Sequence, residues 1–192
     1  GIAIGTGTGK TASGEVAIVA GSSAVPFKFS STGVVPDVNN TYNIGSTALK
    51  YNTVYATVFD GTATKARYAD LAENYSADAE HEPGTVIVLG GAKEITTTAT
   101  KGDSRVIGVV SNKPAYLMNS EAEGVAVALA GRVPCKVEGR IKKGERLVSG
   151  SKPGYAKALG NNDYDMRSIV GRALADKDTF DDGVVEVVVG VK

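Results

Sequence analysis

The sequence predicts a mainly β protein that contains a small barrel or sandwich. Glycine accounts for 24 of the 192 residues, and the chain has no tryptophan and only two methionines. Valine, threonine and alanine are abundant, and the apolar runs are short and separated by Gly, Pro and Asn turns, a pattern typical of strands. Long amphipathic helices are missing, and no G-x-G-x-x-G motif joins a strand to a helix. A dinucleotide-binding α/β fold is therefore excluded.

Residues 1–62 form a first region with few charges and much Gly, Ser, Thr and Asn. Its apolar runs lie at 16–20, 25–29 and 53–59, and the first two have the pattern of strands. A segment with so little apolar surface does not easily bury a core alone. Two explanations stay open: the region is the edge of a larger sandwich, or identical chains wrap together and bury these faces between them.

Residues 63–83 are expected to be a connecting segment. The spacing of Ala63, Ala66, Ala69 and Ala72 allows one or two helical turns, and extended coil is the alternative. The acid-rich part of the segment has the composition of a solvated connection, and a Pro-Gly pair at 83–84 ends it.

From residue 84 the chain reads as strand, turn, strand. Alternating or continuous apolar runs predict strands at 85–91, 94–100, 105–111, 124–131, 133–141, around Leu147 and Val148, at 168–174 and at 184–191. Many short strands with Gly, Pro and Asn turns favour a compact barrel or sandwich over residues 84–192. We expect this part to fold without the preceding residues.

The stretch GTGTGKT at residues 5–11 looks like a phosphate-binding loop, but its spacing is wrong. The motif G-x-x-x-x-G-K-[ST] would need glycine where Ile4 stands. Lys plus Arg and Asp plus Glu are equal at 21 each, so the basic excess of a nucleic-acid-binding protein is missing. No apolar run reaches the ~20 residues of a membrane span. We expect no nucleotide, no nucleic acid and no membrane insertion.

The single cysteine and the single histidine restrict the chemistry further. Cys135 alternates with Val133 and Val137, which favours a buried small apolar side chain, with a nucleophile as the alternative. His81 stands among acidic residues, and a zinc site needs three or four ligands. We therefore expect no metal and no cofactor, and His81 as a catalytic base is the less favoured alternative.

Residues 34–75 carry a resemblance to a known family. The segment contains Asn40-Thr41-Tyr42-Asn43-Ile44-Gly45-Ser46, then Lys50-Tyr51, then Val54-Tyr55-Ala56. It resembles a segment that recurs in the distal part of phage tail fibres and spikes, with Tyr51 at a position where Trp is common. The sequences YADLAENY, EPGTVIVLGG, DSRVIGVVSNKPAYLMN and GVVEVVVGVK, which follow, look like the C-terminal domain of such fibres. That domain is similar to the intramolecular chaperone and self-cleaving domains of pre-neck appendage and tail-spike proteins.

The resemblance implies a virion protein, made in the host cytoplasm, that forms a parallel homotrimer. Residues 1–62 would be the intertwined trimeric stem, and residues 84–192 would act in trimerisation and folding. Ile44, Tyr51, Val54 and Tyr55 are the expected contacts between copies, since they are the large side chains of a segment otherwise short of them. The rest of the tail is an implied partner, and a host-surface glycan or receptor is a further one.

Self-cleavage is the enzymatic alternative, and it would be a single-turnover reaction rather than steady catalysis. Its candidate residues are Asp70, Glu73 and Ser76, because one helical turn would place both carboxylates on one face and could separate them into an acid and a base. The alternative is that both are surface charges. A carbohydrate-binding tip is a further class, with Tyr116 and Tyr155 as stacking candidates, whereas no carboxylate motif of a polysaccharide hydrolase is visible.

Overall fold

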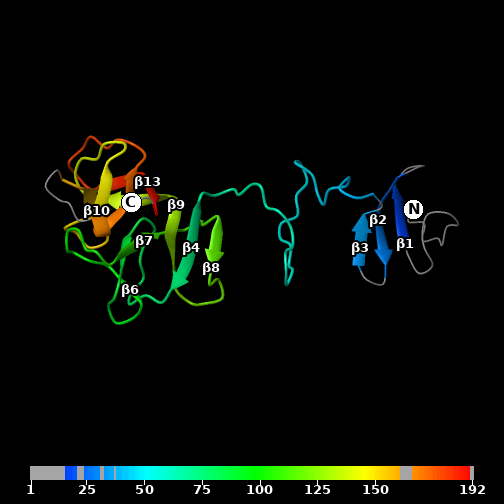
Figure 1. Ribbon diagram of the computed structural model, residues 1–192, viewed down its shortest axis with the longest axis horizontal. Helices are drawn as coiled ribbons and strands as arrows, with labels where there is room; N and C mark the ends of the chain where they lie inside the picture. The colour runs from blue at the N-terminus through cyan, green and yellow to red at the C-terminus, as the bar shows by residue number, and fades with distance from the viewer. Residues whose placement is uncertain (1–15, 21–23, 31–32, 37, 161–165, 191–192) are drawn as a thin grey trace. The chain divides into compact units, whose positions relative to one another are not determined.

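The chain is mainly β, as the sequence predicts. The computed structural model describes residues 16–20, 24–30, 33–36, 38–160 and 166–190, and these contain thirteen strands and one 3-10 helix, η1 (Met166–Ser168), but no α-helix. The chain divides into two compact units, residues 1–61 and 62–192 (Figure 1). The glycine-rich stretch 5–11 lies outside the described residues.

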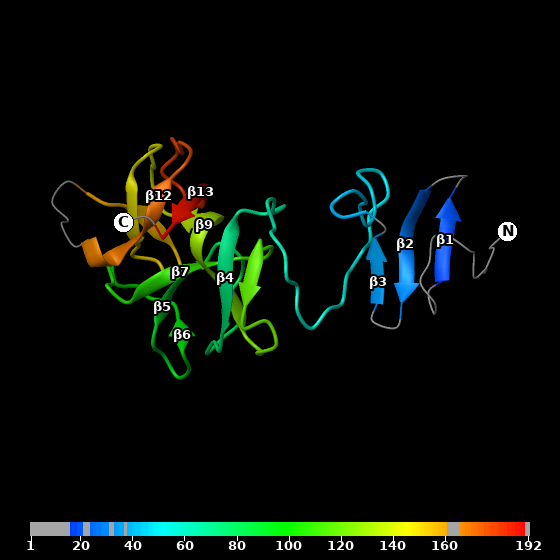
Figure 2. The same cartoon turned by 45° about the vertical axis from the view of Figure 1, so that its right-hand side comes forward.

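The first unit contains a three-stranded antiparallel sheet of β1 (Val16–Ala20), β2 (Ala24–Ser30) and β3 (Gly33–Pro36) (Figure 2). The strands expected at 16–20 and 25–29 are confirmed, and β3 adds to β2 with Phe29 opposite Val34. Residues 38–61 contain no strand.

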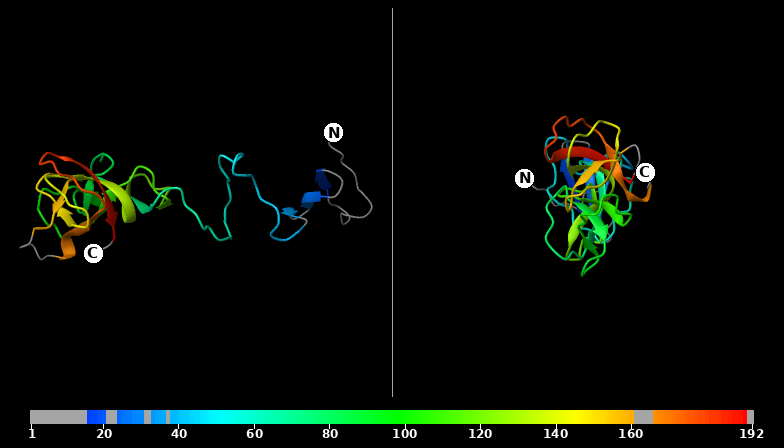
Figure 3. Two further views of the ribbon diagram at one scale, coloured as in Figure 1. Left: turned by 90° about the horizontal axis from the view of Figure 1, so that it is seen from above. Right: turned by 90° about the vertical axis from the view of Figure 1, so that its left-hand side faces the viewer.

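The second unit is built around a closed five-stranded barrel. The strands of the whole second unit are β4 (Asp70–Tyr75), β5 (Val86–Leu89), β6 (Ile95–Thr96), β7 (Val106–Val110), β8 (Tyr116–Met118), β9 (Val125–Val137), β10 (Arg146–Ser149), β11 (Ala156–Ala158), β12 (Ile169–Ala173) and β13 (Gly183–Val189). The barrel order is β9-β13-β12-β10-β11, and the pairing of Ala156 with Val137 returns β11 to β9. Figure 3 shows the yellow-green, yellow, orange and red strands of the barrel grouped together.

Strand β9 joins the barrel to the remaining strands. Its first half pairs with β4 and β7, and its second half pairs with β13. We expected two strands, at 124–131 and 133–141, but the chain continues as one strand through Gly131. This glycine has φ +100°, and a Cβ there would lie 2.1 Å from the carbonyl oxygen of Ala69. Glycine tolerates this backbone conformation and this close approach, so the strand continues through residue 131.

The core has two parts. The larger fills the barrel, with Val133, Cys135, Val137, Ile141, Leu147 and Val187 among its buried residues. A smaller cluster consists of Ile87 on β5, Ile95 on β6, Val110 on β7 and Val127 on β9. Burial raises the pKa of the Cys135 thiol to about 12. The thiolate is thus disfavoured, and Cys135 is a buried small apolar side chain rather than a nucleophile.

Strand β4 is the main difference from the sequence-based expectation. It lies inside the segment 63–83 that we expected to be a connection, and the helical alternative is wrong there. β4 pairs antiparallel with β9 and parallel with β8, and Ala72 is fully buried. These partners lie 45 to 61 residues away along the chain, and such tertiary pairing overrides weak local helix propensity.

A charged cluster stabilises the loop before β7. The Asp103 carboxylate accepts bonds from the Arg105 Nε at 3.0 Å and Nη2 at 2.7 Å, and from the Thr98 hydroxyl at 2.9 Å. The Asp103 N–H donates to the Ser149 hydroxyl at 2.7 Å, which ties the loop to β10. The side-chain bonds from Arg105 hold the pKa of Asp103 well below its usual range.

We therefore expect Asp103 to contribute to the acid sensitivity of the fold. A carboxyl group whose pKa is lowered by folding stabilises the folded state above its unfolded-state pKa, about 3.9 for Asp, and this stabilisation is lost as the pH falls further. Asp103→Asn should lower the free energy of unfolding at pH 7 by about 1.5–3 kcal/mol and flatten its decline below pH 4. Urea unfolding at pH 7 and pH 3 measures both, and an unchanged acid limb would contradict the assignment.

Candidate functional site

The structure does not bring the three sequence-predicted catalytic residues onto one face. Asp70 and Glu73 belong to a strand rather than a helix, and residues three apart in a strand point to opposite faces. Asp70 is buried with Ala72, whereas Glu73 shares its face with Tyr75 and accepts a bond from the Tyr75 hydroxyl at 2.8 Å. The acid–base pairing of these two carboxylates therefore lacks the geometry that a helical turn would have provided.

Ser76 instead has a carboxylate partner that sequence reasoning missed. Its backbone N–H and its hydroxyl both donate to the same Glu94 oxygen, Oε2, each at 2.8 Å. Glu94 lies 18 residues away along the chain. It lies next to Ser76 because the following residues, Ala77 and Ile95, form a parallel β-bridge, and Ile95 is the first residue of β6. No local sequence pattern links these two positions, so the pair is visible only in the tertiary structure.

The electrostatics of this pair define what it can do. The Ser76 backbone N–H and then its hydroxyl lower the pKa of Glu94, so the carboxylate is ionised and is a weak base. Nearby, burial first and the bond to Glu73 second raise the pKa of Tyr75 to about 12, so this phenol keeps its proton. The hydroxyl of Ser76 lies within hydrogen-bond reach of a base, the first requirement of an activated nucleophile. The same bonds also fasten the end of β4 to β6.

A surface hollow lies next to Ser76. It has a volume of about 550 Å³, and its charged lining residues are Asp78, Glu80, Lys93 and Glu123. His81 comes directly after the lining residue Glu80 in the sequence, and its Nε2 lies 3.5 Å from a carboxylate oxygen of Asp78. Among the described residues no group of three or more His, Cys, Asp and Glu side chains is arranged to hold a metal ion.

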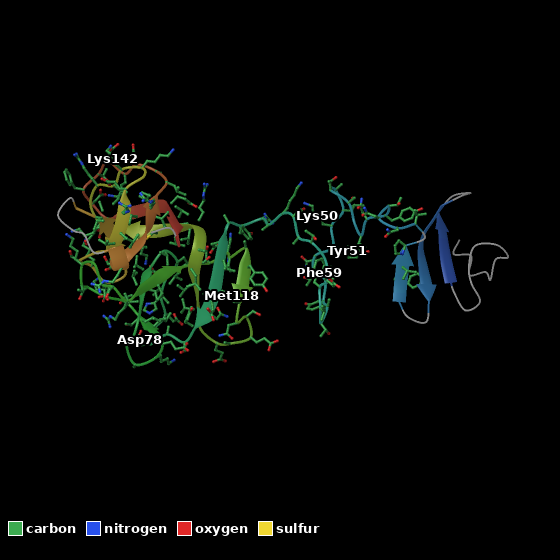
Figure 4. All side chains as sticks on the ribbon, in the orientation of Figure 1. Lys50, Tyr51, Phe59, Asp78, Met118 and Lys142 are labelled. Carbon is green, nitrogen blue, oxygen red and sulfur yellow. The ribbon has the colours of Figure 1, made fainter. Side chains whose placement is uncertain are left out.

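The four expected oligomer contacts are exposed in the single chain. Their exposed fractions are 77% for Ile44, 66% for Tyr51, 70% for Val54 and 94% for Tyr55. Figure 4 shows Tyr51 and Phe59 in the strand-free segment after β3. Of the two tyrosines expected to stack on sugars, Tyr116 on β8 is 67% exposed and Tyr155 is half-buried. The first unit thus presents large apolar side chains that its own chain does not cover.

The fold and these surfaces define a mainly β chain with a closed barrel and an exposed apolar segment before it. No known family description matches the chain, and no curated protein matches it. Among solved structures, it is similar to the crystal structure of the pre-mature bacteriophage phi29 gene product 12, with a TM-score of 0.50 and 14% sequence identity. The match covers 88% of this chain and 24% of that chain. The chain therefore spans about a quarter of the protein that it matches, and the likeness shows the fold alone.

No helix in the described part of the chain is long and apolar enough to cross a membrane.

Proposed function

We propose that this chain is the distal part of a trimeric bacteriophage tail fibre or spike, made in the host cytoplasm and carried on the virion. Residues 1–61 contribute to the stem, and residues 62–192 act in trimerisation and in folding of the stem. In the trimer each chain binds two further copies of itself in parallel orientation. The rest of the tail is the other partner.

The observation that carries this proposal is the exposed apolar surface of residues 34–59. Ten large apolar side chains there are 41% to 94% exposed: Val34, Val35, Val38, Ile44, Leu49, Tyr51, Val54, Tyr55, Val58 and Phe59. Large apolar side chains gathered in one exposed segment are a feature of interaction sites. Identical copies in parallel register would bring the same side chains together around a threefold axis, which supports a stem formed by three chains.

The compact second unit has a physical role in such an assembly. Aligning three weakly structured stems requires closure of long loops, which is entropically slow. A barrel domain that folds first and associates would hold the three stems at high effective concentration. This role needs no catalytic residue, and it is compatible with the absence of strands in residues 38–61 of the single chain.

Native mass spectrometry of the full chain tests the assembly, and Tyr51→Ala tests the contact. We expect a trimer whose melting temperature falls in Tyr51→Ala, because burying one aromatic contributes roughly 1.5–3 kcal/mol and the symmetry repeats that contribution in every copy. Tyr116→Ala is the matched control, since Tyr116 is 67% exposed and Tyr51 is 66% exposed in the single chain. A stable monomer at micromolar concentration would refute the trimer. Equal melting temperatures for Tyr51→Ala and the parent chain would remove Tyr51 from the interface.

Self-cleavage is a second candidate function, favoured by the bond between the Ser76 hydroxyl and Glu94. In this version Glu94, rather than Asp70 or Glu73, accepts the hydroxyl proton as the Ser76 oxygen attacks a peptide carbonyl carbon. The C–N bond breaks, the proton passes to the leaving amine, and water then hydrolyses the resulting ester. Fresh full-length chain should yield two fragments on a denaturing gel over time, and Ser76→Ala should abolish them. The lowered pKa of Glu94 predicts that the rate falls at acid pH as this carboxylate becomes protonated. A single intact band from the parent chain after prolonged incubation would eliminate this candidate.

A further inference from the structure

Three arginines form a row on the outer wall of the barrel, which we call the arginine row. Arg146 of β10 lies opposite Arg172 of β12. Arg172 lies opposite Val188 of β13, and Val188 lies opposite Arg132 of β9. The next residues along these strands are buried in the barrel core: Leu147, Ala173, Val187 and Val133. Since strand residues alternate between the two faces of a sheet, the row faces outward, and four strands at ~4.8 Å spacing give it a width of about 14 Å.

The arginine row has no anionic partner within the part of the chain that the structure describes. None of its three guanidinium groups forms an ion pair there, and Arg172 Nη1 donates to the backbone carbonyl of Gly144 at 3.3 Å. Glu186 is the outward residue before Val188 on β13, so it sets one negative charge beside three positive ones. Like charges directly opposite each other in a sheet are destabilising. The row therefore costs stability in the single chain, and a partner with negative charge would remove that cost.

The hollow at the end of β4 carries the opposite charge, and we call it the acidic hollow. Asp78, Glu80 and Glu123 line it with negative charge, against the single positive charge of Lys93. Glu121 adds a further exposed carboxylate two residues before Glu123 in the same loop. The carboxylates of residues 80, 121 and 123 form no ion pair between the described residues. The second unit thus has one basic and one acidic surface, each without its counterpart.

The two surfaces lie too far apart to neutralise each other within one chain. Val125, which lines the acidic hollow, and Arg132 of the arginine row are seven residues apart on β9. An extended strand covers about 20 Å over that length, whereas charges in solvent are largely screened beyond about 8 Å at physiological ionic strength. A second copy of the chain, however, brings an acidic hollow of its own to the arginine row of the first.

Such a contact has the symmetry that a parallel trimer needs. It joins two different surfaces, so it is head to tail, and repeats of it close into a ring when the rotation between copies allows. Every copy in a ring points the same way along its axis, which agrees with parallel stems. A reciprocal contact in a twofold dimer is the alternative arrangement, and it would place the stems in opposite directions about the contact.

We propose that the arginine row of one copy contacts the acidic hollow of the next copy, head to tail, and that ionic strength thereby controls how fast the copies associate. Arg132 is the exposed member of the row and supplies the direct contact, while the half-buried Arg146 and Arg172 add to the positive potential. The inference rests on the proposed trimer, and it adds the surfaces of the second unit that meet, their arrangement and their response to salt. Complementary charges speed association mainly at low salt, whereas screening has little effect on an apolar stem contact.

The kinetics of assembly of the full chain test this contact. Unfolded chain at micromolar concentration is diluted from urea into about 20 mM or about 500 mM NaCl, on either side of physiological ionic strength, and light scattering follows the trimer. We expect the parent chain to assemble at least about tenfold more slowly at high salt. Arg132→Glu should assemble at low salt as slowly as the parent chain does at high salt. The double variant Arg132→Glu with Glu123→Lys exchanges the charges of the two surfaces and should restore both the rate and its salt dependence.

The matched control is Lys65→Glu, which makes the same change in net charge at an exposed position outside both surfaces and should assemble as the parent chain does. Circular dichroism checks the fold of each variant, and Glu123→Lys alone, which should also slow assembly, replaces Arg132→Glu if that variant fails to fold. Equal rates for these variants and the parent chain would overturn the contact while the trimer itself stands, as would slow assembly that the double variant does not restore. A dimer as the product would overturn the head-to-tail ring. A monomer at both salt concentrations would refute the trimer and this contact with it.

Discussion

Gly131→Ala is expected to destabilise the second unit strongly, at the single glycine of β9. The added Cβ would lie 2.1 Å from the Ala69 carbonyl oxygen, and 2.9 Å from the Asp70 Cα, at a φ of +100°. Backbone strain at such an angle costs about 1–3 kcal/mol, and forcing the neighbouring strand away adds a cost of similar size. We expect a fall in melting temperature of about 5 °C or more.

Gly139→Ala is the matched control for this substitution. Gly139 has φ +74°, but nothing lies within 4 Å of the position where its Cβ would be. It should lose only the cost of left-handed backbone, about 1–2 kcal/mol. Comparing the thermal unfolding of both variants separates the destabilisation caused by the close approach of β4 and β9 from that caused by backbone strain. Equal losses in the two variants would show that this approach does not constrain residue 131.

The second large effect is expected from removing β4. A chain of residues 62–192 should unfold cooperatively, whereas residues 84–192 should lose on the order of 5 kcal/mol, because six paired residues of β4 are removed at about 1 kcal/mol for each hydrogen bond. β8 also loses its partner, and the link from Ser76 to Glu94 disappears. We therefore expect residues 62–192, rather than residues 84–192, to be the part that folds alone.

Urea unfolding followed by circular dichroism measures this difference. Residues 66–192 are the control, since they lack part of the preceding segment but keep β4 and should match residues 62–192. If residues 84–192 unfolded at the same urea concentration as both longer chains, β4 would be an accessory strand. The outcome also bears on the proposed role in assembly, because it defines the smallest part of the chain that can fold before the stem.

The candidate sites show where sequence reasoning reached its limit. Asp70, Glu73 and Ser76 were the candidates for self-cleavage, with the two carboxylates as the acid–base pair, but the hydrogen-bond partner of Ser76 in the structure is Glu94. The spacing argument assumed a helical turn, and a strand places Asp70 and Glu73 on opposite faces. Asp70 is instead buried, opposite Gly131 of β9 and beside a surface hollow. Neither contact leaves a periodic pattern in the sequence.

The sequence by itself determined the β class and most strands of the second unit. Val185, Val187 and Val189 alternate with outward residues and predict β13, and the alternation around Cys135 predicts its burial, because period-two patterns report directly on which face meets the core. The tertiary structure alone decided β4, the three-residue strands β8 and β11, and the closure of the barrel through Ala156 and Val137. Strands this short have no local signature of their own, and their stabilisation comes from backbone pairing with partners far away in the chain.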